Sequence, residues 1–361
     1  MDTVLVRFAG IAKEFSVSKT LASFSFFGNT VNIRWYGAII AFGFLLAALL
    51  GGRIAYKWKI SLDKMVDVLI YGTFGGVIGA RLFYVFSRWD YYGSHPGDIV
   101  KIWEGGLAIY GGIIGGLICA FIVCKIEKIN VLNLLDMVGI SLLVGQGIGR
   151  WGNFANQEAF GTFTGKHFGM MSDTVIEYIK ANPADFGLSE LVKNGGDVSK
   201  YIADNDLYVH PTFFYESVWC LLGVAVLYIV LRKFRLFSGQ MFLTYGVWYG
   251  MERAVVEGMR TDSLYISGTS LRISQVISML LVAVCGVLLV GFIIKFKKNP
   301  KPVEGVDFFP EKTAKELEEY EKKQMRKAIK QERKKVKIAG GKIVSDQRKQ
   351  KEEENNVSDN N

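Results

Sequence analysis

The chain has 361 residues, of which 50% are hydrophobic and 13% aromatic, and its mean hydropathy is +0.23. These values exceed what a soluble globular domain of this length needs to fill its core, so the composition favours an integral membrane protein. The formal net charge is +9, and we expect no nucleic-acid partner.

Residues 1–30 precede the first apolar run and show no cleavable signal peptide. No charged stretch there leads into an apolar run with a small-residue cleavage site. The run that begins near Ile33 is therefore the expected insertion signal, and residues 1–30 are expected to form an extracytoplasmic N-terminal segment.

Seven apolar runs follow, each long enough to cross a hydrocarbon core about 30 Å thick. They lie near residues 33–52, 66–86, 106–124, 131–149, 213–231, 239–256 and 273–294. The second, fourth and sixth runs contain charged or polar residues, and the alternative for these is a buried helix of a soluble domain. We predict an all-α integral membrane protein with about seven transmembrane helices, its catalytic membrane domain spanning residues 31–295.

Lysine and arginine gather in the loops after the first, third and fifth runs and after the seventh. Short cytoplasmic loops carry such an excess under the positive-inside rule. The long segment between the fourth and fifth runs, in contrast, has more acidic than basic residues. The N-terminus is therefore expected outside the cytoplasm and the C-terminus inside.

Two polar regions lie outside the apolar runs. Residues 161–211 contain weak helical patterns such as TVIEYIKANPADF and predict a small extracytoplasmic head between the fourth and fifth spans. Residues 296–361 form a charged, basic cytoplasmic tail that is expected to be partly helical or disordered. The tail could contact anionic lipid head groups, or it could have no specific partner.

Ionisable groups at membrane depth cost several kcal/mol unless they are paired or reach water, so they indicate function. The stretch GRWGNFANQEAFG ends the fourth run and carries Arg150, Asn153, Asn156 and Glu158. A guanidinium group beside amides suits a phosphate or a carboxylate. The alternative is an interfacial arginine that reaches the lipid head groups.

A second polar group stands at the outer end of the sixth run, in GMERAVVEGMR. Arg253, Glu257 and Arg260 stand at helical spacing and can form a charge ladder, which could also be purely structural. Further polar residues stand at the expected outer ends of other runs, where interfacial belts or helix starts can also account for them: Arg34 and Tyr36, Glu104 and Tyr110, and His210 and Glu216. Together these groups predict a net-positive cavity that opens to the outer leaflet and suits a lipid with an anionic phosphate.

Cysteines and histidines do not indicate a metal site. The four cysteines fall in or beside apolar runs and the three histidines are scattered. We expect no metal and no cofactor.

The stretch GQGIGRWGNFANQEAFG resembles the signature of the prolipoprotein diacylglyceryl transferase family. WYG, EGGLAxYGG, HPTFFYE and RxxxEGxR recur in the family's order, and the resemblance covers residues 30–295. It implies a bacterial cell-membrane enzyme with seven spans and its N-terminus outside. Such an enzyme transfers the diacylglyceryl group of phosphatidylglycerol to the lipobox cysteine thiol of a preprolipoprotein, and glycerol phosphate leaves.

The resemblance also implies site residues. The expected catalytic residues are Arg253, Glu257, Tyr110 and Tyr36. The residues expected to bind phosphatidylglycerol are Arg150, Asn153, Glu158, Gly161, Arg260, Glu216, Asn133 and Asp136. The implied partners are phosphatidylglycerol, preprolipoprotein signal peptides with a lipobox cysteine, and membrane lipids.

One departure from the family leaves the general base open. Many members have histidine at the position of Tyr110, and tyrosine, with a reference pKa of about 10, is a poor base at neutral pH. Glu257 or Tyr110 could accept the thiol proton, or the arginines could lower the thiol pKa. Two other functions compete with the enzyme: a transporter, favoured by the deeper Asn133 and Asp136, and a non-catalytic scaffold.

Overall fold

The computed structural model describes residues 3–299, apart from 27–28, 59, 165–167, 262, 267 and 270, together with residues 319, 322, 325 and 326. The tail expected over residues 296–361 therefore lies almost entirely outside the described residues.

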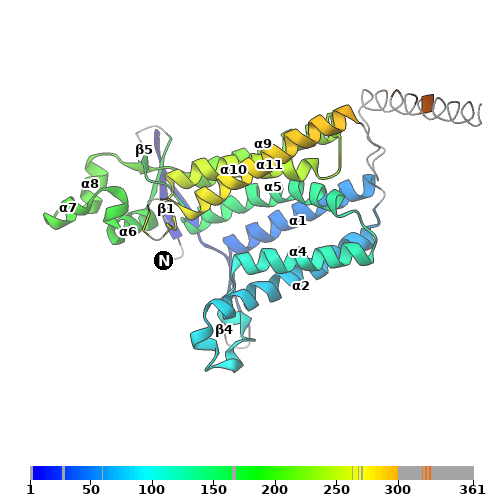
Figure 1. The fold of residues 1–361 in the computed structure, drawn as a ribbon. Helices are drawn as coiled ribbons and strands as arrows, with labels where there is room; N and C mark the ends of the chain where they lie inside the picture. Colours follow the sequence, from blue (N-terminus) through cyan, green and yellow to red (C-terminus); the bar gives the residue numbers. More distant parts are fainter. Residues whose placement is uncertain are drawn as a thin grey trace, which may run out of the picture.

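In the part of the chain that the structure describes, seven helices have 18 residues or more. They lie side by side with their axes approximately parallel (Figure 1). They coincide with the seven apolar runs, and the prediction of a mostly helical membrane protein is confirmed. Their bounds are α1 Trp35–Lys57, α2 Leu62–Ser87, α4 Ile109–Ile126, α5 Val131–Asn156, α9 Thr212–Lys233, α10 Gln240–Met259 and α11 Ile273–Lys298.

Within the described residues, six of these helices are long and apolar enough to cross a membrane. The exception is α10, which has sufficient length but carries Glu252, Arg253 and Glu257. Such a concentration of ionisable groups is tolerated in a bundle only where other helices satisfy it.

The helix α5 is central to the bundle, since it packs against α1, α9 and α10, while α11 covers α10. On the other side of α1, α2 and α4 form a close pair. Glycines permit this approach: a Cβ atom added at Gly111 would lie 2.3 Å from the carbonyl oxygen of Gly79. Small residues are the usual means by which membrane helices come so close.

Strands form outside the long helices, and no local pattern of the sequence predicted them. β1 (Thr3–Phe8) and β2 (Ile11–Ser18) join β5 (Phe163–Thr164), β6 (Met170–Ser172) and β7 (Tyr208–Val209) in one sheet, with strand order β2-β1-β6-β7-β5. β3 (Thr20–Phe26) and β4 (Asn29–Arg34) form a separate hairpin. The N-terminal segment is thus part of the head, because β1 pairs antiparallel with β6.

Short helices complete the segments between spans. In the head these are α6 (Asp173–Ala181), η3 (Pro183–Phe186), α7 (Ser189–Lys193) and α8 (Val198–Asp204). The helical pattern expected in TVIEYIKANPADF is therefore confirmed. The connection from α2 to α4 contains α3 (Trp89–Tyr92), η1 (Pro96–Asp98) and η2 (Ile102–Glu104).

The head has its own apolar core. Met170, Met171, Val175, Ile179 and Val209 are completely buried there. The head lies at one end of the bundle (Figure 1). The loops from α1 to α2, from α4 to α5 and from α9 to α10 lie at the opposite end.

Candidate active site

The polar stretch that ends α5 closes the helix at its head end. Gln157 adopts the left-handed conformation, with φ of 56°. The amide of Glu158 donates to the carbonyl of Asn153 at 3.0 Å, and that of Gln157 donates to Phe154 at 3.1 Å. These are the two hydrogen bonds of a Schellman motif, which here forms without the usual glycine.

Glu216 of α9 is the centre of the candidate site. Its side chain is 1% exposed, and two arginines from different helices approach it. Arg150 Nε of α5 lies 2.8 Å from Glu216 Oε2, and Arg253 Nη1 of α10 lies 3.0 Å from Oε1. Two guanidinium groups from different helices thus converge on one buried carboxylate.

Glu257 continues this network along α10. Arg253 Nη2 lies 2.5 Å from Glu257 Oε2, one helical turn away. The start of α11 holds the same turn in place, because Arg272 donates to the backbone carbonyl of Glu257. We define Arg150, Glu216, Arg253 and Glu257 as the arginine cluster.

Aromatic residues fix the relative register of α9 and α10. The indole nitrogen of Trp219 donates to the carbonyl of Trp248, and Trp248 donates to that of Trp219, both at 3.0 Å. Their rings stack with centroids 4.6 Å apart. Glu216 lies one turn from Trp219, so this reciprocal contact aligns the carboxylate with Arg253.

The amides after Arg150 turn toward the end of α5. Asn153 Nδ2 donates to Glu158 Oε1 at 3.1 Å, and Asn156 Nδ2 reaches the same oxygen at 3.4 Å. Glu158 is exposed. The three residues form a polar rim beside Arg150, as expected from their spacing, but no hydrogen bond among the described residues joins this rim to Glu216.

Tyr36 lies beside this segment of α5. Its ring packs against Gly152, where an added Cβ atom would lie 3.0 Å from Tyr36 Cδ2. Tyr36 is 37% exposed. The structure therefore brings the WYG and GRWGN motifs together, and a side chain at position 152 would push the tyrosine away.

Gly161 and Arg260 meet through their backbones. They form an antiparallel bridge, and the Gly161 amide donates to the carbonyl of His210 at 3.0 Å. A Cβ atom at Gly161 would lie 2.8 Å from that of His210 and 3.0 Å from the carbonyl of Met259. Glycine is therefore needed at position 161, because the segments that contain Gly161, His210 and Met259 come too close there for a side chain. Burial lowers the pKa of His210, so its ring is neutral at neutral pH.

Tyr110 is not part of the arginine cluster. It lies in the first turn of α4 and is 52% exposed, and α4 packs chiefly against α2. Among the described residues no hydrogen bond joins its hydroxyl to the cluster.

Asn133 and Asp136 lie at the opposite end of α5. Asp136 precedes Arg150 by 14 residues, which is about 21 Å along a helix. Arg235 Nη2 lies 2.8 Å from Asp136 Oδ2 and donates to Asn133 Oδ1 at 2.8 Å. Asp136 also accepts from the amides of Gly239, Met241 and Phe242 at the start of α10. Asp136 thus has partners that tie α5 to the start of α10. The depth of Asn133 and Asp136 in the fourth span therefore has a structural explanation and no longer favours a transporter.

Glu252 of α10 was missed by the sequence analysis. It is 5% exposed, neither carboxyl oxygen has a hydrogen-bond partner among the described residues, and it lies beside Glu216. The sequence did contain a signal, because Glu252 is an ionisable residue in the sixth run, next to Arg253. Its position in the sequence alone did not show that it lies beside the carboxylate of Glu216.

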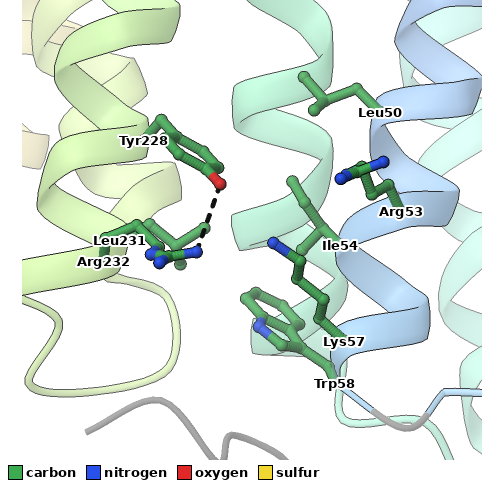
Figure 2. Close-up of a pocket in the computed structure, with 8 residues that line it drawn as sticks. All are labelled: Leu50, Arg53, Ile54, Lys57, Trp58, Tyr228, Leu231 and Arg232. Carbon is green, nitrogen blue, oxygen red and sulfur yellow. Dashed lines mark hydrogen bonds between the residues drawn. The ribbon is translucent and has the colours of Figure 1, made fainter. Parts of the chain in front are cut away.

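A cavity of about 170 Å³ lies between the ends of α1 and α9 (Figure 2). Arg53, Lys57 and Arg232 line it together with apolar side chains. Tyr228, which also lines it, follows Glu216 by 12 residues, or about 18 Å along the helix. This cavity is therefore separate from the arginine cluster. No group of metal-ligating side chains is found within the part of the chain that the structure describes.

The chemistry available at the arginine cluster is anion binding and charge neutralisation. Two guanidinium groups converge from α5 and α10, and their side chains keep 18% and 17% exposure. Planar guanidinium groups bind phosphate oxygens in a bidentate manner. An incoming phosphate would share Arg150 and Arg253 with the carboxylates that hold them in place.

Comparisons with known proteins show the family of this chain. Residues 23–291 match the family described as prolipoprotein diacylglyceryl transferase. A phosphatidylglycerol–prolipoprotein diacylglyceryl transferase of Lysinibacillus sphaericus is 41% identical over 253 residues, which cover 69% of this chain and 84% of the relative. A Staphylococcus aureus protein of the same name is 38% identical over 285 residues, which cover 79% and 93%. The chain therefore belongs to the prolipoprotein diacylglyceryl transferase family.

Proposed function

We propose that this protein transfers the diacylglyceryl group of phosphatidylglycerol to the lipobox cysteine thiol of preprolipoproteins. This would be a step of lipoprotein maturation in a bacterial membrane. The observation that carries the proposal is the convergence of Arg150 and Arg253 on the buried Glu216, at the head end of the bundle. Family membership supplies the substrates, as named for the relatives.

The orientation proposed is a seven-span protein with its N-terminus outside. The basic loops lie at the end of the bundle opposite the head (Figure 1), as the positive-inside rule requires of a cytoplasmic end. The strands of residues 3–34 and the head of residues 161–211 are then extracytoplasmic, and the tail of residues 296–361 is cytoplasmic. The arginine cluster would lie near the outer leaflet, within reach of lipid head groups.

The proposed reaction exchanges one bond for another. The cysteine sulfur bonds to the glyceryl carbon, the bond from that carbon to the phosphate oxygen breaks, and the electron pair leaves with the oxygen. The thiol proton goes to a base, and glycerol phosphate departs. Arg150 and Arg253 neutralise the charge that grows on the phosphate, which is the main electrostatic requirement of the step.

The other expected site residues have supporting parts in this proposal. Asn153 and Glu158 form the polar rim beside Arg150, and Tyr36 packs against Gly152 in the same part of α5. Gly161 and Arg260 form the backbone bridge between the segment after α5 and the end of α10. Glu257, which is paired with Arg253, is a candidate base for the thiol proton. For Asn133 and Asp136 we propose a structural role.

The direct test uses the purified protein in detergent with phosphatidylglycerol and a synthetic peptide that contains a lipobox cysteine. We expect the peptide to gain the mass of one diacylglyceryl group and glycerol phosphate to appear in equal amount. The matched control is the same peptide with serine in place of cysteine, which should stay unmodified. If the folded protein binds the lipid but yields neither product, the proposed transferase activity is refuted.

Replacement of Tyr110 with phenylalanine tests the proposed tyrosine base. Because Tyr110 is half exposed and outside the arginine cluster, we expect the variant to keep kcat within about threefold of the wild type, well below the 10²- to 10⁴-fold loss typical of a removed general base. The measurement is kcat in the peptide assay at saturating lipid. A loss of about 10²-fold or more, with KM unchanged, would instead place the hydroxyl in the proton transfer.

A further inference from the structure

Glu252 of α10 is a buried carboxyl group that accepts no hydrogen bond from any of the described residues. It is 5% exposed, and its two oxygens have no hydrogen-bond partner among the described residues. The neighbouring Glu216 Oε2 also lacks a hydrogen bond of acceptable geometry, although Arg150 Nε lies 2.8 Å away. Buried polar atoms in native proteins are almost always paired, so three oxygens without a hydrogen bond on two neighbouring carboxyl groups require an explanation.

A shared proton provides that explanation. Two carboxylates that face each other in a buried site cannot both stay ionised at low cost, and one proton between them supplies the missing hydrogen bond. Glu216 is held between two guanidinium groups, so we assign the negative charge to it. No ion pair joins Glu252 to a guanidinium group among the described residues, so we assign the proton to Glu252.

The charge balance of the site follows from this assignment. With Glu252 neutral, Arg150 and Arg253 balance Glu216 and Glu257. With Glu252 ionised, the same group of side chains carries one net negative charge, which opposes an anion. The charged or titratable side chains with which Glu252 interacts are Arg150 from α5, Glu216 and Cys220 from α9, and Tyr245, Tyr249 and Arg253 from α10 itself. From α11, Ser278 and Val282 meet α10 at Gly250 and bring no charge.

We propose that Glu252 and Glu216 share one proton, and that this proton makes the binding of an anionic phosphate head group at Arg150 and Arg253 dependent on pH. Glu252 is a positioning residue that acts through Glu216 and Arg150. When it is protonated, it donates to Glu216 and lets Arg150 turn to the phosphate. When it is ionised, it competes for Arg150 and repels the ligand. The binding part of this inference rests on the proposed function, whereas the shared proton does not.

Infrared difference spectroscopy tests the proton itself. The wild type and the Glu252→Gln variant are compared at neutral pH, with Glu177→Gln, an exposed glutamate of the head, as the matched control. We expect Glu252→Gln to lose the carbonyl stretch of a protonated carboxylic acid, and Glu177→Gln to keep it. An unchanged acid band in Glu252→Gln would overturn the proposal, whether or not the protein is a transferase.

Steady-state kinetics test the coupling to the phosphate. At saturating peptide, we expect the wild-type KM for phosphatidylglycerol to rise roughly tenfold between pH 7 and pH 9, within the usual range of linked equilibria. Glu252→Gln should show a flat KM over this range, because glutamine fills the same space without titrating. Glu252→Met, which also cannot ionise, replaces it if the glutamine variant does not fold. A KM that still rises in the folded variant would refute the coupling, even if the infrared band behaves as expected.

Discussion

Replacement of Arg150 with lysine should lower kcat/KM for phosphatidylglycerol by about 10²- to 10³-fold, the usual loss when one preorganised charge-stabilising donor is removed. Lysine keeps the positive charge but has a single ammonium group, so it cannot hold Glu216 through Nε and offer two parallel donors to a phosphate. The measurement is initial rate against lipid concentration in the lipobox-peptide assay.

The control for this variant lies at the other end of the bundle. Arg53→Lys makes the same exchange in the cavity between α1 and α9, away from the arginine cluster, and should keep kcat/KM near that of the wild type. Circular dichroism and gel filtration establish that both variants are folded. Activity of Arg150→Lys within tenfold of the wild type would mean that Arg150 does not provide bidentate contact with the phosphate.

Replacement of Asp136 with asparagine should destabilise the protein by about 3–5 kcal/mol, the usual cost of breaking one side of a buried ion pair. The side chains of Asp136 and Arg235 are 0% and 1% exposed, so the variant leaves a buried guanidinium group without its counter-charge. The Arg235 guanidinium also stacks 4.4 Å from the Trp58 ring centre, which leaves little room for water to replace the carboxylate. Unfolding in mixed detergent and dodecyl sulfate measures the change.

A partly exposed ion pair at the same end is the control. Lys64 Nζ lies 3.4 Å from Glu127 Oε2, with side chains 40% and 31% exposed, and Lys64→Gln should cost less than about 1 kcal/mol. Below its unfolding transition, Asp136→Asn should bind phosphatidylglycerol like the wild type, because the arginine cluster is about 21 Å away along α5. If Asp136→Asn had wild-type stability and a much higher KM for phosphatidylglycerol, Asp136 would instead belong to the substrate-binding site.

The helices were predictable because membrane insertion depends on local composition. A run of about twenty apolar residues satisfies its own backbone hydrogen bonds as a helix, whatever its neighbours are. The expected run at 131–149, for example, is contained in α5, which extends to Asn156. Predicted and observed ends differ by up to seven residues, because polar residues can continue a helix beyond its apolar part.

The strands were not predictable from local patterns. β1 has partners on both sides, and its pairing of Val6 with Ser172 joins residues far apart in the chain. The alternation of polar and apolar residues within a six-residue strand does not indicate which distant strand will pair with it. Residues 1–30 were therefore predicted only as an extracytoplasmic N-terminal segment, whereas β1 and β2 belong to the head sheet and β3 pairs with β4 in the separate hairpin.

The candidate site divides in the same way. The sequence by itself determined that Arg150, Arg253 and Glu257 are charged groups at the ends of apolar runs, and it predicted a function for them because charge at membrane depth is costly. Only the tertiary structure decided that Arg150 and Arg253 share Glu216, that Asp136 pairs with Arg235, and that Glu252 faces Glu216 without a donor. The physical reason is that the cost of a buried charge depends on its partners in space, and those partners lie on other helices.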